Sequence, residues 1–318
     1  MKIAYIILGH KSPDQIKRLV CKLNTEGVSF LIHFDKKSEN KLYKKLVDEV
    51  SIFPNVYFIK RYKIYWGDFS IVRATIEAIK EIFIKNISFD WVILLSGQDY
   101  PLKSNNQIQE TLQTNEDRLF ISHCVYPAKE SKVMNNTYRI DYYHINIFNI
   151  RLVFPGDLAF NTANESRIKR FIWLRWFSLV WLYLVKLFPI KRKFPEGFIP
   201  YVGSQFWCLS KDCITYIYNF ILQNPGFVKF FNYVDIPDEM FFQTIILNSM
   251  FRDRVASENL FYIDWKNPNP KYPRTFVKND FEILVNCQKL FARKFDATRD
   301  VDILDMLDRH TLNKVGID

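Results

Sequence analysis

Glycine is scarce in this chain, with 9 residues among 318, beside 13 prolines. Glycine-rich linkers and collagen-like or low-complexity architectures are therefore excluded. The sequence also contains none of the motifs GxGxxG, GxxxxGK[ST], GxSxG or HExxH. Their absence removes the usual dinucleotide-binding, P-loop, serine-hydrolase and zinc-protease interpretations.

Cysteine is rare as well, and its five positions form no metal-binding pattern. Cys208 and Cys213 have no second pair beside them, so the pattern favours buried free thiols over a zinc site. The apolar run at residues 3–8 ends too soon for a signal-peptide core with a cleavage site, and it predicts a buried strand. A reducing, cytoplasmic location is therefore expected.

The positive charge is moderate and dispersed. Lys and Arg exceed Asp and Glu by 44 − 34 = 10, with only short basic runs such as residues 191–193. Because nucleic-acid binders usually gather their charge in one patch or tail, no nucleic-acid partner is expected. The chain is 48% hydrophobic and 17% aromatic, which excludes disorder.

No apolar run is long enough to cross a bilayer. The longest candidate, residues 171–188, is uninterrupted only between Arg175 and Lys186, which is shorter than the roughly 20 residues that a span needs. Two interpretations stay open: a core helix, or an interfacial helix whose aromatic side chains and flanking cations contact acidic lipid.

The first third of the chain alternates strand and helix patterns. Strands are predicted at residues 3–8, 30–34, 56–59 and 91–95, and helices at about 13–23, 39–50 and 69–84. Strand then helix, repeated at this spacing, predicts a parallel sheet with right-handed crossovers.

The rest of the chain is less regular. Residues 135–200 show no clear pattern, and a strand at 201–209, a helix at 214–222 and a helix from Pro237 to Met250 follow. Without an internal repeat or a linker, we expect one continuous α/β domain over residues 1–318.

Polar groups follow three of the predicted strands, at residues 9–11, 35–38 and 96–99. Ligands of parallel sheets bind at these carboxyl ends. A second candidate is the pair Asp238 and Glu239, which either caps and complements a helix or supplies a reactive carboxylate. A third is the pair Arg293 and Lys294, which is either a solvated basic stripe or holds one inward cation that needs an anion.

A metal-binding Asp-x-Asp is missing from the ends of the central strands. The only such motif, Asp300-Val301-Asp302, stands near the C-terminus. If this chain transfers a sugar from a nucleotide, we expect Arg and Lys to replace the metal at the diphosphate. The alternative is a metal site formed by Asp300 and Asp302.

Six segments in sequence order resemble one family. They are residues 3–10 (IAYIILGH), 32–38 (IHFDKKS), 95–103 (LSGQDYPLK), 203–210 (GSQFWCLS), 237–239 (PDE) and 291–295 (FARKF). Together they resemble the core-2/I-branching β-1,6-N-acetylglucosaminyltransferase and peptide O-xylosyltransferase family, glycosyltransferase family 14, in its bacterial form. The resemblance covers about residues 1–300.

This resemblance implies an inverting GT-A transferase with a Rossmann-like, mostly parallel nucleotide-binding sheet. The single domain would then consist of a nucleotide-binding half (residues 1–115) and a C-terminal acceptor-binding and catalytic half (residues 116–318). It also implies a UDP-sugar donor and no metal. Glu239 matches the catalytic base, and Lys294 matches a cation on the diphosphate. The partner of Lys294 falls on Lys271 by spacing or on Arg274 by residue type, and we choose Arg274.

The remaining correspondences are contacts to donor and acceptor. Matches to nucleotide contacts are Leu8, Gly9, His10, Asp35, Lys36, Lys37 and Trp66, the last often Tyr in the family. Candidate acceptor contacts are Glu130, Arg139 and Trp265.

We expect transfer of GlcNAc, with xylose as the alternative, to a glycan or lipid-linked oligosaccharide of the bacterial surface. The enzyme would work in the cytoplasm or on the cytoplasmic face of the inner membrane, in peripheral contact with acidic lipid. A membrane-peripheral sugar-binding protein that has lost turnover is the alternative from another functional class.

Overall fold

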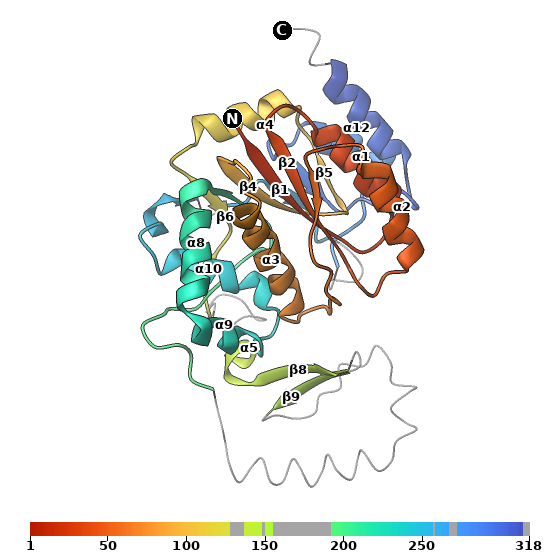
Figure 1. Ribbon diagram of the computed structural model, residues 1–318. Helices are drawn as coiled ribbons and strands as arrows, with labels where there is room; N and C mark the ends of the chain where they lie inside the picture. Colours follow the sequence, from red (N-terminus) through yellow and green to blue (C-terminus); the bar gives the residue numbers. More distant parts are fainter. Residues whose placement is uncertain (128–136, 148–149, 155–191, 257, 267–271, 314–318) are drawn as a thin grey trace, which may run out of the picture.

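The structure is a computed structural model that describes residues 1–127, 137–147, 150–154, 192–256, 258–266 and 272–313 (Figure 1). Glu130, Lys271 and the apolar segment 171–188 lie outside the described residues. The predictions made for them are therefore not addressed by the structure.

A seven-stranded sheet forms the centre of the molecule. Its strands, in spatial order, are β12 (Val255–Ala256), β6 (Leu119–Ile121), β11 (Trp207–Ser210), β4 (Trp91–Ser96), β1 (Ile3–Gly9), β2 (Val28–Phe34) and β3 (Val56–Phe58). Strands β1 to β4 are parallel, whereas β11 runs antiparallel to both β4 and β6. The predicted α/β class with a mostly parallel sheet is confirmed.

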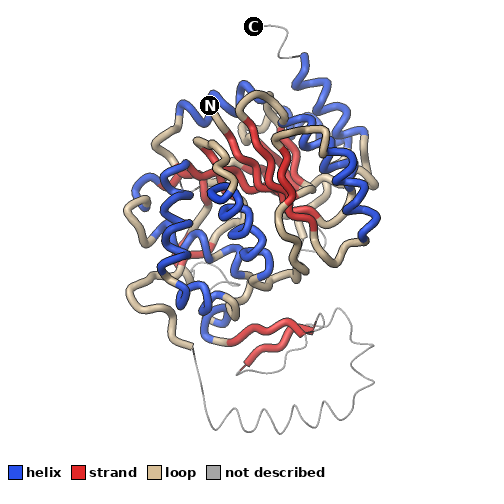
Figure 2. The backbone as a smooth tube through the Cα atoms, in the orientation of Figure 1, coloured by secondary structure: helices blue, strands red, loops and turns tan. Residues whose placement is uncertain are grey.

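Helices cover both faces of this sheet (Figures 1 and 2). One core contains Ile3, Tyr5 and Ile7 of β1, and the helices that supply its other side are α1 (Pro13–Leu23), α2 (Asn40–Val50) and α12 (Asp302–Asn313). The opposite core contains Ala4 and Ile6, and its helices are α3 (Ser70–Ile84), α8 (Lys211–Gln223), α9 (Pro225–Phe231) and α10 (Phe241–Leu247). Alternate residues of β1 thus face opposite cores, which explains why the strand is almost continuously apolar.

Smaller elements surround the carboxyl ends of the parallel strands. Strands β13 (Phe261–Ile263), β14 (Phe291–Arg293) and β5 (Asp99–Pro101) form a three-stranded sheet, and β7 (Cys124–Val125) pairs with β10 (Tyr201–Val202). A hairpin joins β8 (Tyr143–Ile147) and β9 (Ile150–Phe154). The other elements are α4 (Asn105–Thr114), α5 (Tyr138–Asp141), α11 (Phe281–Val285), η1 (Pro237–Glu239), η2 (Arg252–Arg254) and η3 (Lys278–Asp280).

The prediction of one strand at 201–209 is wrong. The chain forms β10 and β11 in two different sheets, with Gly203 between them. A Cβ atom at Gly203 would lie 1.7 Å from the backbone oxygen of Ser122, so only glycine allows this approach. The sequence did not reveal the break, because the side chains of both strands are buried and apolar residues therefore occur on both sides of it.

The prediction of one helix from Pro237 to Met250 is also wrong. The 3₁₀ turn η1 ends at Glu239, and α10 begins only at Phe241. Ile236, which precedes η1, has a left-handed backbone with φ 48°, and no side chain caps the turn. The interpretation of Asp238 and Glu239 as the first residues of a long, capped helix is therefore incorrect.

No helix among the described residues is long and apolar enough to cross a membrane.

Candidate active site

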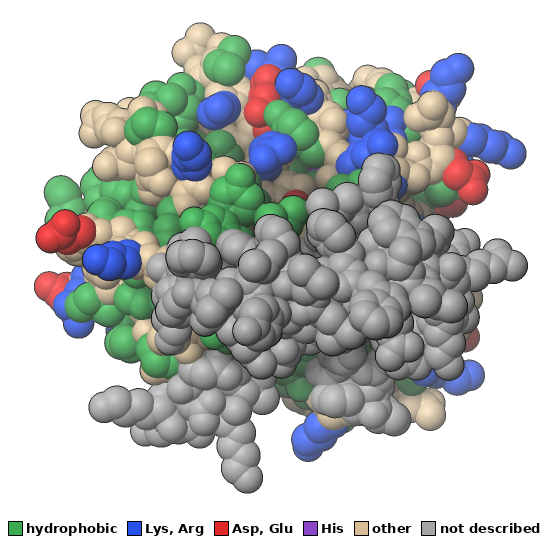
Figure 3. All heavy atoms as spheres, turned by 90° about the horizontal axis from the view of Figure 1, so that it is seen from below, with side chains coloured by type: hydrophobic (Ala, Val, Ile, Leu, Met, Phe, Trp, Pro, Cys, Tyr) green, Lys and Arg blue, Asp and Glu red, His purple; other side chains and the backbone are tan. Residues whose placement is uncertain are grey.

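The parallel strands end at one edge of the sheet, which carries several of the predicted nucleotide contacts. In Figure 1, β1 starts beside the N-terminus and runs downward, and Figure 3 views the molecule from below, with Lys and Arg side chains (blue) among the visible atoms of that face. Gly9 ends β1, and its carbonyl accepts a hydrogen bond of 2.8 Å from the backbone N–H of Asp35, directly after β2. Leu8, Gly9, His10 and Asp35 are therefore brought together as predicted.

The carboxylate of Asp35 organises the neighbouring loop. It is buried, and its Oδ1 accepts hydrogen bonds from the backbone N–H groups of Lys37 (2.8 Å) and Ile64 (3.1 Å). Its Oδ2 lies 3.9 Å from the Lys37 ammonium, which also sits over the ring of Tyr65. Lys36 and Lys37 are exposed. The second carboxylate oxygen therefore faces a cation rather than a backbone donor.

A buried histidine, His33, also holds the backbone beside Asp35 in place. His33 Nε2 accepts a 2.9 Å hydrogen bond from the backbone N–H of Tyr62, and the Tyr62 carbonyl accepts from Lys36. Burial lowers the pKa of His33 to about 4, so the ring stays neutral at pH 7 and can accept this bond. Trp66, on the same loop, has 61% of its surface exposed. Sequence reasoning missed the role of His33, although it stands inside the segment IHFDKKS.

A cluster of cations lies at the end of β14. Arg293 forms a 2.7 Å ion pair with Asp99, which is fully buried, and it also donates to the Ser96 hydroxyl. The expectation that one cation of the Arg293–Lys294 pair is packed inward against an anion is thus met by Arg293. The nearby Lys11 pairs with Asp296 at 2.6 Å.

Lys294 differs from these two cations. Among the described residues, no carboxylate lies within ion-pair distance of its ammonium group. Burial, together with the charges of Arg293 and Lys11, lowers the pKa of Lys294. Burial also lowers the pKa of His10, and Lys11, Arg293 and Lys294 lower it further. His10 thus lies close to Lys11, Arg293 and Lys294, and the carboxylate of Asp35 opposes their effect on its pKa.

Arg274 is placed differently from its predicted partner Lys294. Its guanidinium donates to Asp264 at 2.9 Å and, through two parallel bonds of 2.8 Å, to Asp280. These bonds raise the pKa of Arg274 and compensate its charge with two carboxylates. The side chain is 30% exposed. The structure therefore shows Arg274 as a bridge between β13 and η3.

The turn η1 places Glu239 at the same edge of the sheet. Its carbonyl accepts a 2.8 Å hydrogen bond from Gly203, which precedes β11. The backbone N–H of Ile236 donates to the carbonyl of Gly67, beside Trp66, at 3.1 Å. The turn that carries Glu239 is thus bonded directly to the loop that Asp35 and His33 organise.

Arg139 is the partner of Glu239. The two side chains form an ion pair of 3.1 Å between Nη2 and Oε2, and their side chains are 9% and 31% exposed respectively. Burial raises the pKa of Glu239, and the positive charge of Arg139 opposes this rise. Arg139, a predicted acceptor contact, is therefore bonded to Glu239, the predicted base. Trp265, another predicted acceptor contact, follows β13 and is 57% exposed.

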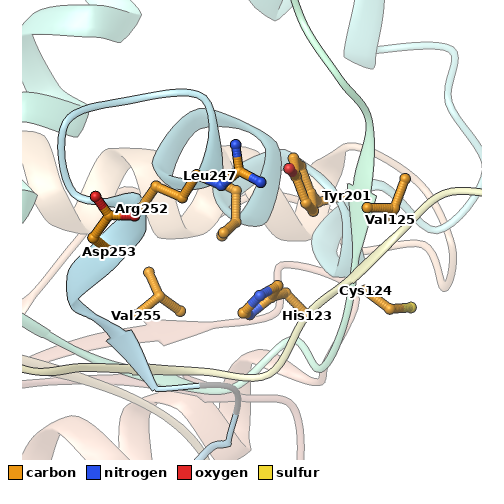
Figure 4. A pocket seen from close by; sticks show the side chains of 8 residues that line it. All are labelled: His123, Cys124, Val125, Tyr201, Leu247, Arg252, Asp253 and Val255. Atoms are coloured by element: carbon orange, nitrogen blue, oxygen red, sulfur yellow. The ribbon is translucent and has the colours of Figure 1, made fainter.

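A cavity of about 380 Å³ lies beside the β7–β10 ribbon (Figure 4). It is lined by His123, Cys124, Val125, Tyr201, Leu247, Arg252, Asp253 and Val255. Figure 4 shows Tyr201 and His123 pointing into it and the Cys124 sulfur pointing away. None of the predicted site residues lines this cavity.

The alternative metal motif is used as a helix cap. Asp300 accepts hydrogen bonds from the backbone N–H groups of Lys278 and Ile303, at 2.9 and 3.2 Å, at the start of α12. Among the described residues, no group of three or more His, Cys, Asp or Glu side chains is placed to share a metal ion.

Comparison with known proteins gives consistent relatives at low identity. Xylosyltransferase 2 of Rattus norvegicus is 24% identical over 335 residues, which cover 98% of this chain and 34% of that protein. Beta-glucuronosyltransferase GlcAT14B of Arabidopsis thaliana is 24% identical over 323 residues, covering 98% and 66%. The N-acetyllactosaminide beta-1,6-N-acetylglucosaminyl-transferase of Mus musculus is 23% identical over 338 residues, covering 99% and 75%.

This chain thus spans about a third of the length of the xylosyltransferases that it matches. A family model described as Core-2/I-Branching enzyme matches residues 3–285, which include β1, Glu239 and the Arg274 bridge. Because that match covers most of the chain, the protein belongs to the Core-2/I-branching enzyme family, and the relatives above are glycosyltransferases.

Proposed function

We propose that this protein transfers a sugar from a UDP-sugar to a hydroxyl group of a glycan, with inversion at the anomeric carbon and without a metal ion. One observation carries the proposal: a reachable carboxylate, Glu239, and an ammonium with no carboxylate partner among the described residues, Lys294, lie at the same edge of the sheet. A carboxylate can take a proton there, and a cation can receive a leaving diphosphate.

The donor half of the proposal rests on the β1 and β2 ends. Asp35 keeps one carboxylate oxygen for a ligand after two backbone donors have occupied the other. The exposed indole of Trp66 offers a flat apolar surface for a nucleobase. The ammonium of Lys294 supplies a positive charge where the diphosphate would bind, and the ring of His10, whose pKa burial and nearby cations lower, lies close to it. Arg274 is not included, because two carboxylates already compensate it.

The chemical step uses Glu239 as the general base. Its carboxylate takes the proton of the acceptor hydroxyl while the hydroxyl oxygen bonds to the anomeric carbon. The bond from that carbon to the UDP oxygen breaks on the opposite face, and its electron pair leaves with UDP, so the configuration inverts. Fixed cations such as Lys294 stabilise the charge that builds on the diphosphate.

Absence of a metal requirement is part of the proposal. The Asp300 carboxylate accepts two backbone hydrogen bonds at the start of α12, which supports a structural role for the only Asp-x-Asp motif. We therefore expect turnover to survive EDTA. Activity that is lost in EDTA and restored by Mn²⁺ would contradict this part of the proposal.

The test is UDP release and sugar transfer by the purified protein. UDP-GlcNAc, UDP-xylose and UDP-glucuronic acid are each incubated with a panel of oligosaccharide acceptors, because the relatives include all three transferase types. We expect acceptor-dependent UDP release with one donor, and a β-linked product from an α-linked donor.

Glu239→Gln is the matched variant for the catalytic step. It keeps the size and the hydrogen-bonding capacity of the side chain but cannot take the proton, so transfer should fall by about 10²- to 10⁴-fold. UDP binding, measured by calorimetry, should remain unchanged. If Glu239→Gln turns over as fast as the wild type, the assignment of the base is refuted. If the wild type binds UDP but transfers no sugar, the alternative of a sugar-binding protein is favoured.

A further inference from the structure

The ion pair between Arg139 and Glu239 joins two distant parts of the chain. Arg139 belongs to α5, and Glu239 ends η1, one hundred residues later. The guanidinium Nε donates to the carbonyl of Asp235 at 3.0 Å, and Nη2 donates to the carbonyl of Ile236 at 2.6 Å and to Glu239 Oε2 at 3.1 Å. One side chain thus holds both the carboxylate and the backbone that leads to it.

The backbone between the two residues is bonded in the other direction as well. The N–H of Asp235 donates to the carbonyl of Arg139 at 3.0 Å. Arg139 is therefore bonded to Asp235 both through its own backbone carbonyl and through its guanidinium group. Ile236 follows with φ 48°, which a β-branched residue adopts only under restraint from its surroundings. Its carbonyl is one of the groups that Arg139 holds.

Exposure separates the roles of the two side chains. The Glu239 side chain is 31% exposed, whereas that of Arg139 is only 9% exposed and lies near the ring of Tyr126, 5.9 Å from its guanidinium carbon. This arrangement favours an action of Arg139 through Glu239. This differs from the direct acceptor contact that the family resemblance implies.

We propose that Arg139 is a positioning residue, which fixes the Glu239 carboxylate and the strained turn before it so that Oε1 faces the acceptor hydroxyl. The proposal rests on the proposed function, because it assumes that Glu239 is the base. Arg139 holds Oε2, and the acceptor proton therefore goes to Oε1. The fixed positive charge also keeps the carboxylate ionised in a buried setting.

The sign of the charge effect follows from the surroundings of Glu239. Burial raises its pKa, and Arg139 is the charged group that opposes this rise. The other titratable groups near the pair are Asp235 and Asp238 on the same segment, and Cys124 and Tyr126 across Arg139. Without Arg139 the pKa of Glu239 rises, the base is protonated up to a higher pH, and the acidic limb of the kcat profile moves upward.

The experiment compares three variants across pH 4 to 9. In Arg139→Gln we expect the acidic limb of kcat to move up by about one pH unit or more. In Arg139→Lys, which keeps the charge but loses the planar fork, we expect a lower kcat with the limb within about half a unit of the wild type. Thermal melting of each variant checks that it folds.

Arg192→Gln is the matched control. Arg192 is as buried as Arg139, but its partners among the described residues are the carbonyls of Tyr142, Phe230 and Tyr233 and nearby aromatic rings. Its loss should lower the melting temperature and leave the acidic limb in place. A shift in this control would attribute the effect to general loosening rather than to the Arg139–Glu239 pair.

A second readout does not need turnover. The carboxyl carbon of Glu239 is followed by NMR in protein labelled with ¹³C-glutamate and assigned by its absence from the Glu239→Gln spectrum. We expect a higher titration midpoint in Arg139→Gln than in the wild type. This midpoint can be measured even if no UDP-sugar is a substrate, so failure of the proposed function and failure of the Arg139 assignment are distinguished.

Two results would overturn the assignment. One is a lower kcat in Arg139→Gln with an unchanged acidic limb and an unchanged Glu239 midpoint, which would leave Arg139 with a merely structural role. The other is an effect confined to the KM of the acceptor, which would indicate direct acceptor binding.

Discussion

Arg274 and Lys294 come from neighbouring parts of the chain, and the sequence predicts a diphosphate contact for both. Their surroundings differ. Arg274 is compensated by Asp264 and Asp280, whereas Lys294 lies beside two other cations and has no carboxylate partner among the described residues. The comparison teaches that residue type and spacing identify a cation, but its counter-ions decide whether its charge is available to a ligand.

Replacement of Lys294 should have the largest effect on activity. Lys294→Met removes the positive charge while keeping the apolar stem, and we expect kcat/KM for the UDP-sugar to fall by about 10²- to 10³-fold. The melting temperature should stay the same or rise slightly, because a partly buried cation near other cations is removed. A variant with near wild-type kcat/KM would show that Lys294 is not the diphosphate cation.

Replacement of Arg274 should mainly affect folding. Arg274→Met leaves Asp264 and Asp280 without their cation, and we expect the free energy of unfolding to fall by about 2 kcal/mol, a value discounted for partial exposure. Urea denaturation measures this change, and calorimetry should give an unchanged affinity for UDP. A large loss of UDP affinity with unchanged stability would reverse the distinction between the two cations.

The smallest effect is a difference in acid sensitivity. A backbone hydrogen bond from Lys266 and the bond from Arg274 hold the pKa of Asp264 below its usual range. Its stabilising contribution is therefore complete above the unfolded pKa of about 4 and is lost as the pH falls through the lower folded value. Between pH 5 and pH 3 the wild type should lose more unfolding free energy than Arg274→Met. Parallel losses in the two proteins would rule out a contribution from this bridge.

The first half of the fold could be predicted from the sequence because its signals are local. The apolar runs at residues 3–8 and 30–34 and the helical spacing of Ile16, Leu19 and Leu23 fix strands and helices without distant partners. The observed β1, β2 and α1 agree with those predictions within two residues.

The rest could not be predicted because distant contacts determine it. The break at Gly203 depends on the backbone of Ser122, and the backbone that leads into η1 has its carbonyls held by Arg139. The same reason applies to the site: Glu239 could be chosen from its motif, but its partner, one hundred residues away, gave no local signal. His33 stood in a recognised segment, yet only its bond to Tyr62 reveals its role.

The close approach of Gly203 to Ser122 affects what can be concluded when a substitution at position 203 abolishes the function of this protein. Every other residue at position 203 adds an atom where the Ser122 oxygen already lies, and the resulting shift is passed to Glu239 through the bond from the Gly203 N–H to the Glu239 carbonyl. If the proposed function holds, a saturation scan scored on sugar transfer would therefore rank position 203 with Glu239, the proposed base, although glycine contributes no functional group. Such a map reports the geometry of the backbone as much as the chemistry of side chains.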